Sequence, residues 1–132
     1  AITQESLPNK KESQFKDIDP QSIGISYVQK ENNFNDYDLQ LLLPQKQSEI
    51  SSALAVADVN NDGLDDIYIG NARGASGVLY FQSTNGTFYK TNDKLLENDK
   101  EFEDTDAEFL DIDNDGDLDL YVASGGKSFS NL

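Results

Sequence analysis

The sequence predicts an all-β fold of antiparallel strands joined by acidic turns. Short runs of β-branched and aromatic residues alternate with clusters of Gly, Asn and Asp, which is the pattern of strands and turns. A unit made of a strand, an acidic loop and a second strand occurs twice, with an offset of 53 residues. Between the two units, Asn85-Gly86 separates two further apolar runs and is a strong signal for a tight hairpin.

The second acidic loop holds five aspartates in nine residues, and these like charges repel one another unless a cation lies among them. A hard cation such as Ca²⁺ takes about 6 to 8 oxygen ligands, and side chains at positions 1, 3 and 5 of a tight loop can supply some of them. Gly116 stands at position 6, where the chain must turn sharply. The expected ligands are Asp111, Asp113, Asp115, the backbone oxygen of Asp117, and Asp119.

The first acidic loop repeats this spacing, again with Gly at position 6. Its expected ligands are Asp58, Asn60, Asp62, the backbone oxygen of Leu64, and Asp66. We therefore expect two Ca²⁺ sites. The second loop should bind more tightly, because the neutral Asn60 replaces a carboxylate in the first.

Two other interpretations of the loops can be compared with this one. An EF-hand places a bidentate Glu at position 12 between two helices, but here Ile69 and Val122 occupy that position inside strand-like runs. Surface turns rich in Asp and Asn also form without metal. The repetition of the same acceptor positions favours calcium over metal-free turns.

The loops with their flanking strands, followed by residues 70–81, resemble FG-GAP/VCBS repeats, most strongly those of bacterial extracellular VCBS-repeat proteins. Such repeats form the blades of calcium-binding β-propellers in integrin alpha chains, cartilage acidic protein and many bacterial surface proteins. Residues 24–34 are similar to the segment that precedes the first blades of the bacterial proteins. The resemblance covers about residues 15–126 and implies about two antiparallel propeller-like blades with calcium-binding hairpin loops.

The expected organisation is an extended N-terminal arm, residues 1–22, followed by a β domain, residues 23–132. Repeat 1 covers about residues 50–90 and repeat 2 about residues 103–132. The arm is polar and has no helical or strand periodicity.

Four antiparallel strands, the content of one propeller blade, are expected in repeat 1. They are residues 52–57, 66–70, 78–82 and 87–90. A short helical turn is expected around Leu95 and Leu96. The acids of residues 101–106 are expected to form a solvated surface.

Before the first loop, alternation predicts a strand over residues 23–28, and turn-forming residues predict a loop over 32–38. The apolar run 39–43, which ends at Pro44, is expected to lie in the core.

The composition excludes several kinds of chemistry. The 132-residue chain has no Cys, His, Met or Trp, so thiolate nucleophiles, imidazole bases and the usual zinc or haem ligands are absent. Its net charge is −15, and residues 51–132 carry 17 acidic and 5 basic side chains. Such a surface repels phosphate, which argues against nucleic acid and anionic membranes as partners. No apolar run is long enough for direct membrane insertion.

These features predict a calcium-binding extracellular module with a structural, adhesive or interaction role, and not an enzyme. Loops of moderate affinity fill where free calcium is high, so we expect the protein outside the cell or at its surface, with a signal peptide removed before Ala1. The expected partners are a protein or glycan at the cell surface, or copies of the chain itself. In such a self-assembling filament, the N-terminal arm would add a strand to the next subunit.

The alternative is a fragment of a larger propeller with carbohydrate-binding or glycoside-hydrolase activity. Two recognisable repeats are fewer than the roughly 4 to 8 blades of a closed propeller. A pair of carboxylates from the acidic stretch would suit glycoside hydrolysis. The most clustered carboxylates are, however, those expected to bind calcium in the loops.

Overall fold

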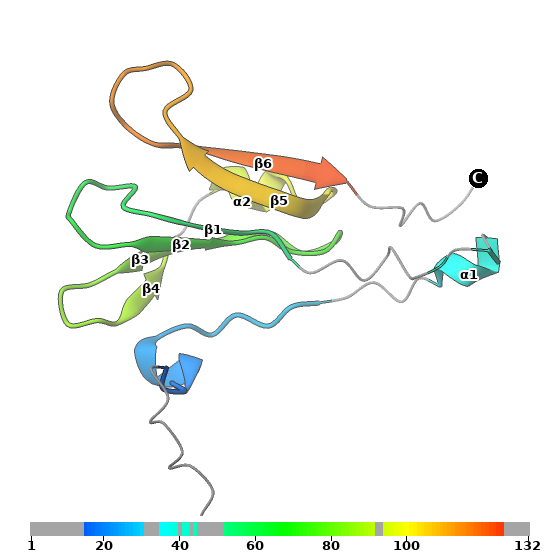
Figure 1. Cartoon of the computed structure of the whole chain (residues 1–132), viewed down its shortest axis with the longest axis horizontal. Helices are drawn as coiled ribbons and strands as arrows, with labels where there is room; N and C mark the ends of the chain where they lie inside the picture. Colours follow the sequence, from blue (N-terminus) through cyan, green and yellow to red (C-terminus); the bar gives the residue numbers. More distant parts are fainter. Residues whose placement is uncertain are drawn as a thin grey trace, which may run out of the picture.

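A computed structural model of the chain describes residues 15–30, 35–39, 41–42, 44, 52–91 and 94–125. Within these residues the strands are β1 (Leu54–Ala57), β2 (Asp66–Ile69), β3 (Val78–Gln82), β4 (Phe88–Lys90), β5 (Glu103–Leu110) and β6 (Asp119–Gly125) (Figure 1). The helices are short: the 3-10 helix η1 (Pro20–Ile23), α1 (Asp36–Leu39) and α2 (Lys94–Asn98). None of these described helices is long and apolar enough to cross a membrane.

The strands form two antiparallel sheets, which confirms the predicted fold class. In sheet A, β1, β2, β3 and β4 are neighbours in chain order, and in sheet B β5 pairs with β6. The four predicted strands of repeat 1 are therefore present, and the hairpin turn before β4 has Gly86 at a positive φ of 81°. The helical turn around Leu95 and Leu96 is also confirmed, as α2.

The two sheets repeat the same strand register. In sheet A, Leu54 pairs with Ile69 and Ala57 with Asp66. Residues 53 positions later make the equivalent pairs in sheet B, where Ala107 pairs with Val122 and Leu110 with Asp119. The sequence repeat is thus a structural repeat, and it places equivalent residues on equivalent faces of the two sheets.

The apolar core lies between the two sheets. Its buried members are Ala53, Ala55, Tyr68 and Ala107, and the partly buried Leu79, Leu96, Phe109, Leu120 and Val122 pack against them. The alanines are small, so the sheets can approach closely around one large aromatic ring. Sheet B lies against this face of sheet A, as Figure 1 shows, and α2 contributes Leu96 to the same core.

A buried carboxylate, that of Asp104 at the start of β5, joins the two sheets. Its Oδ2 accepts hydrogen bonds from the Tyr68 hydroxyl and from the Asn71 backbone N–H, both at 3.0 Å. The Asp104 backbone also pairs with Asn71 and Ala53. At Gly70 a Cβ would lie 2.5 Å from the Asp104 Cβ, so only glycine allows this approach. The expectation that residues 101–106 form a solvated surface is therefore wrong for Asp104, and also for the buried Glu103.

We expect Tyr68→Phe to lower the free energy of unfolding by about 2 kcal/mol, because it removes a buried hydrogen bond to a charged acceptor. Urea unfolding at neutral pH measures this loss. Tyr121→Phe is the matched control, since Tyr121 is the residue 53 positions later and is 57% exposed. A loss in Tyr121→Phe equal to that in Tyr68→Phe would contradict this account of the sheet contact.

The same pair predicts a pH dependence. Burial, together with the charge of Asp104, holds the pKa of Tyr68 well above its ordinary value. The tyrosine of the unfolded chain ionises near pH 10, so the contribution of Tyr68 is complete below that pH and declines above it. Between pH 9 and 11 the wild type should therefore lose more stability than Tyr68→Phe does.

The prediction of a strand over residues 23–28 is wrong. Asp19 caps η1 by accepting a hydrogen bond from the Gln21 backbone N–H at 3.1 Å, and Gly24 ends the helix in the left-handed conformation. Residues 25–30 then run beside sheet A without joining a ladder. One contact of this segment is made by a side chain, since the Tyr27 hydroxyl donates to the Gly70 carbonyl at 2.8 Å.

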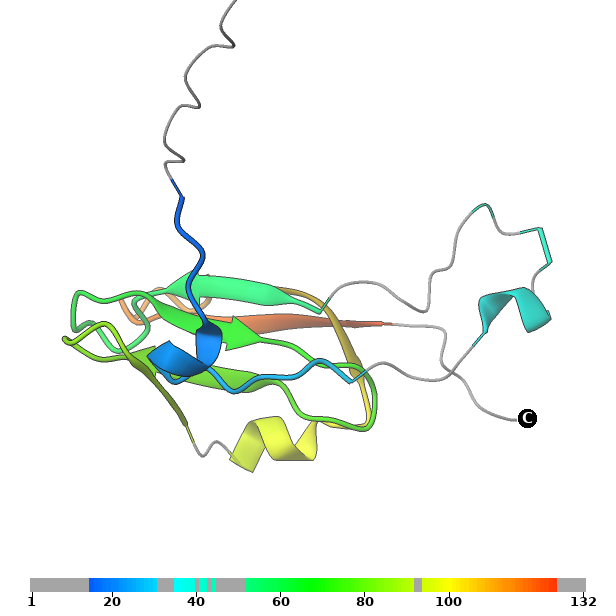
Figure 2. The ribbon, with the colours of Figure 1, turned by 90° about the horizontal axis from the view of Figure 1, so that it is seen from below.

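The predictions for residues 32–44 are also partly wrong. Asp36–Leu39 is a single helical turn, α1, and Asn35 supports it by donating to the Asp38 carboxylate at 2.9 Å. The expected core role of 39–43 fails for Leu41 and Leu42, which are 83% and 97% exposed. Figures 1 and 2 both place α1 beyond the end of the sheets, and residues 32–34, 40 and 43 of these predictions lie outside the described residues. Of the predicted arm, residues 1–14 lie outside the described residues.

Candidate metal centre

Both acidic loops connect the two strands of a hairpin and lie at the same end of the molecule (Figure 1). Residues 58–65 join β1 to β2, and residues 111–118 join β5 to β6. The equal strand registers of the two hairpins explain why the loops have equal lengths and begin at equivalent residues.

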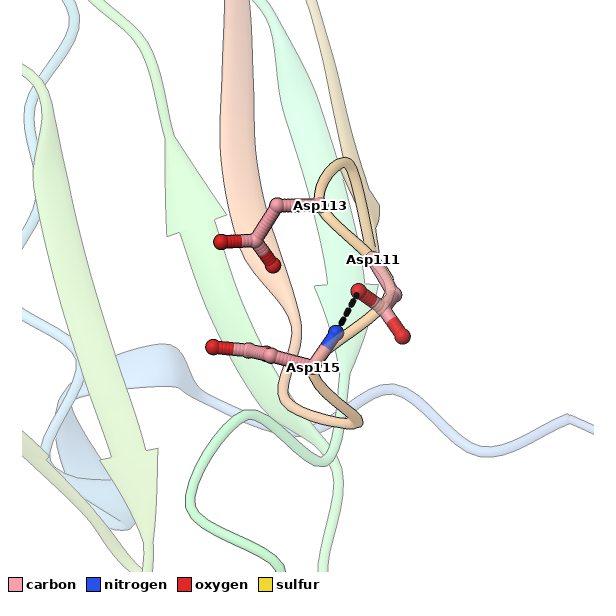
Figure 3. Close-up of side chains that lie close together, drawn as sticks. All are labelled: Asp111, Asp113 and Asp115. Carbon is pink, nitrogen blue, oxygen red and sulfur yellow. Dashed lines mark hydrogen bonds between the residues drawn. The ribbon is translucent and has the colours of Figure 1, made fainter.

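Three carboxylates meet in the second loop. Asp111, Asp113 and Asp115 each offer one oxygen, and these oxygens all lie within 4.8 Å of one another (Figure 3). Oxygens bound to a single Ca²⁺ at about 2.4 Å lie at most about 4.8 Å apart. The spacing therefore fits one calcium coordination sphere, and all three side chains are exposed to solvent from which an ion could enter.

Side-chain to backbone hydrogen bonds shape this loop. Asp111 accepts from the backbone N–H groups of Asp115 and Gly116, both at 3.1 Å, and Asp115 accepts from that of Asp117 at 3.1 Å. The left-handed conformations of Asn114 and Gly116 allow the tight turn. An oxygen has two lone pairs, so these bonds leave acceptor capacity for a metal.

The first loop has the same hydrogen bonds. Asp58 accepts from Asp62 N at 3.0 Å and from Gly63 N at 2.8 Å, and Asp62 accepts from Leu64 N at 2.9 Å. Asn60 adds a bond of its own, in which its side-chain oxygen accepts from Asp62 N at 3.0 Å. The neutral amide thus takes part in the loop scaffold, at the position where the second loop has a third carboxylate.

Position 9 has a structural role that the sequence did not indicate. Asp66 is fully buried, and its two oxygens accept from Val59 N at 3.2 Å and from Gln82 N at 2.9 Å. It therefore ties its own loop to β3. Asp119, its counterpart, accepts the equivalent loop bond from Ile112 N at 3.1 Å and is only partly buried.

The electrostatics of the second loop reflect its crowding. The backbone N–H of Asp117 is the main cause that lowers the pKa of Asp115. The pKa of Asp117 is raised, first by its hydrogen bond with the Asp115 side chain and then by the neighbouring negative charges. Among the described residues, no Lys or Arg side chain forms an ion pair with a carboxylate of either loop. The described part of the chain thus supplies backbone dipoles here but no compensating cation.

These features define a class: a β-repeat protein whose blades carry acidic hairpin loops. Residues 58–122 match a family model described as FG-GAP-like repeat, and over this range the chain is similar to that family. Repeats of this kind are structural or interaction modules. The finer resemblance to VCBS repeats stays a prediction. Searches of curated proteins and of solved structures gave no match.

Proposed function

We propose that the chain is a calcium-stabilised interaction module of the propeller-repeat type, with one Ca²⁺ bound by each acidic loop. The observation that carries this proposal is the meeting of three carboxylates within the span of one calcium coordination sphere. In each loop the proposed ligands are positions 1, 3, 5 and 9 and the backbone oxygen of position 7. We propose no catalytic role, because the acidic cluster found among the described residues is itself the proposed calcium site.

The buried carboxylate of the first loop supports the proposal. Asp66 is fully buried, yet its hydrogen-bond partners are neutral backbone N–H groups. Burying an ion without an opposite charge is costly, and among the described residues no basic side chain is paired with it. A calcium ion in the same loop would supply that opposite charge.

The second loop should bind calcium more tightly than the first, because its side-chain ligands include one more carboxylate. Calorimetry should resolve two binding phases, and Asp115→Asn should remove the tighter one. Asn60→Asp in the first loop should reduce the difference in calcium affinity between the two phases. If Asp115→Asn leaves the tighter phase intact, this ranking of the two loops is wrong.

We further propose that the module works outside the cell. Exposed loops of this kind suit the affinities of extracellular modules, with dissociation constants of about 10⁻⁴–10⁻³ M, which fill only where calcium is abundant. A dissociation constant below micromolar for both loops would argue for a site that fills inside the cell.

A surface for a partner is suggested by the repeat itself. Leu54 and Val56 on β1 are 61% and 54% exposed, on the face of sheet A opposite to sheet B. Their counterparts in sheet B, Ala107 and Phe109, pack against sheet A. In sheet B this face of the repeat is thus a packing surface. In sheet A the equivalent face is exposed at Leu54 and Val56, and we propose that a blade from a second copy of the chain covers it.

Light scattering in calcium tests this contact. The mass should rise with protein concentration, and Val56→Lys should abolish the rise. Tyr89→Lys is the matched control, since Tyr89 is 52% exposed but alternates to the other face of sheet A. A wild-type chain that stays monomeric at every concentration rules out the second copy and leaves a different protein or a glycan as partner.

A further inference from the structure

We propose a second ligand site, separate from the calcium loops: a cavity that binds an acidic sugar unit, meaning a small polyhydroxylated carboxylate. The cavity has a volume of about 360 Å³ and is walled by the segment 26–30, the connection 74–78, the end of β4 and helix α2. These elements come together around one edge of sheet A (Figure 2). A volume of this size is in the range of small-molecule pockets, roughly 300–1,000 Å³.

The charge of the lining points to an anion. Among the described lining residues, the charged ones are Lys30, Lys90 and Glu97, in a chain whose net charge is −15. Among the described residues neither lysine has a carboxylate within ion-pair distance. Two basic side chains in one concave wall, with no acidic partner, can bind a carboxylate by charge-assisted hydrogen bonds.

The remaining lining groups suit hydroxyl groups of a ligand better than a bare inorganic ion. The lining includes the hydroxyl-bearing residues Ser26 and Ser76 and the aromatic residue Tyr80. The Thr91 hydroxyl also belongs to the lining and is buried without a hydrogen-bond partner among the described residues. A buried hydroxyl without a hydrogen bond is unfavourable, and the hydroxyl of a bound sugar would supply the missing partner.

The acidic loops lie far enough away to allow an anion here. The first acidic loop follows β1, and the second lies at the same end of the molecule (Figure 1), whereas the cavity wall formed by residues 74–78 lies at the opposite end of β2. Four residues of extended strand, Asp66–Ile69, span about 13 Å. This length exceeds the Debye length of about 8 Å at physiological ionic strength, so the loop charges are largely screened at the cavity.

The test is a titration of the full ¹⁵N-labelled chain, in calcium, with sodium glucuronate, followed by NMR. Glucose and sodium sulfate are titrated separately. We expect glucuronate to shift the backbone resonances of Ser76 and Thr91 and not those of residues 111–118. Glucose and sulfate should each bind at least about tenfold more weakly, because each lacks one of the two recognised groups.

Variants identify the basic groups. The double variant Lys30→Gln, Lys90→Gln should weaken glucuronate binding by at least about tenfold, whereas Lys16→Gln, an exposed lysine outside the lining, should not change it. The spectra of the variants report whether each one is folded. Repeating the glucuronate titration in chelator, followed on the same resonances, tests whether binding in the cavity depends on calcium in the loops.

Each of the following results would overturn the assignment. No shift at Ser76 and Thr91 means that the cavity does not take glucuronate. If glucose binds as tightly as glucuronate, the lysines do not recognise the carboxylate. If sulfate binds as tightly as glucuronate, the site does not recognise the sugar. Shifts confined to residues 111–118 mean that glucuronate acts through bound calcium.

Discussion

Removing calcium is expected to lower the free energy of unfolding by about 2.7 kcal/mol for each loop whose ion was present at 100 times its dissociation constant. For two loops the loss is about 5 kcal/mol, a large part of the stability of a domain of this size. The physical reason is twofold: bound ions stabilise only the folded chain, and without them the 17 acids of residues 51–132 repel one another.

Urea unfolding in calcium and in chelator measures this loss. Sodium chloride is adjusted to give equal ionic strength, so that general screening of the acids does not imitate binding. A free energy of unfolding that is the same in both conditions would contradict calcium stabilisation of the loops.

The second large effect is expected from Asp66→Asn, which should lower the free energy of unfolding by about 2–3 kcal/mol. The Asp66 carboxylate accepts from two backbone N–H groups, those of Val59 and Gln82. An amide has one oxygen and one NH₂ group, so one of these buried N–H donors would lose its acceptor and face another donor. Urea unfolding in chelator isolates this structural effect from any effect on metal binding.

Asp119→Asn is the matched control for this substitution. Asp119 accepts the equivalent bond, from Ile112 N, but it is only partly buried, and among the described residues no hydrogen bond ties it to a third strand. Water can form hydrogen bonds with the polar groups around Asp119. The free energy of unfolding in chelator should therefore fall by less than about 1 kcal/mol. Equal losses in the two variants would show that the link from Asp66 to β3 does not matter for stability.

The loops could be predicted from the sequence because their geometry is local. Every hydrogen bond within residues 58–64 or 111–117 joins residues at most 5 positions apart, for example Asp58 to Gly63. Alternating acceptors and a glycine specify such a turn directly. The repeat offset of 53 residues predicted the same strand, loop and strand in both units, and the two hairpins indeed share one register.

The contacts between sheets could not be predicted in this way, because they depend on residues distant in sequence. Tyr68 and Asp104 are 36 positions apart, and the acid-rich surroundings of Asp104 indicated a solvated surface. Tyr68 and Tyr121 occupy the same position of the repeat, yet only Tyr68 is buried, since a second sheet covers it. Burial here is decided by the neighbouring blade and not by the local pattern.

The segment after η1 shows a further limit of local patterns. Alternation over residues 23–28 predicted a strand, but Gly24 lies where a Cβ would clash with the Phe88 carbonyl. The chain passes close to sheet A at this glycine, and residues 25–30 do not enter the hydrogen-bond ladder of the sheet.

Calorimetric titration of the metal-free chain with calcium chloride tests the central claim most directly, with Asp111→Asn, Asp113→Asn as the comparison. The account predicts two ions bound per wild-type chain and one per double variant, the lost event being the tighter one. Asp17→Asn, Asp19→Asn, which removes equal charge outside the loops, should keep both events. A wild-type chain that binds no calcium at millimolar concentration, or a double variant that still binds two ions, would contradict calcium binding by the acidic hairpin loops.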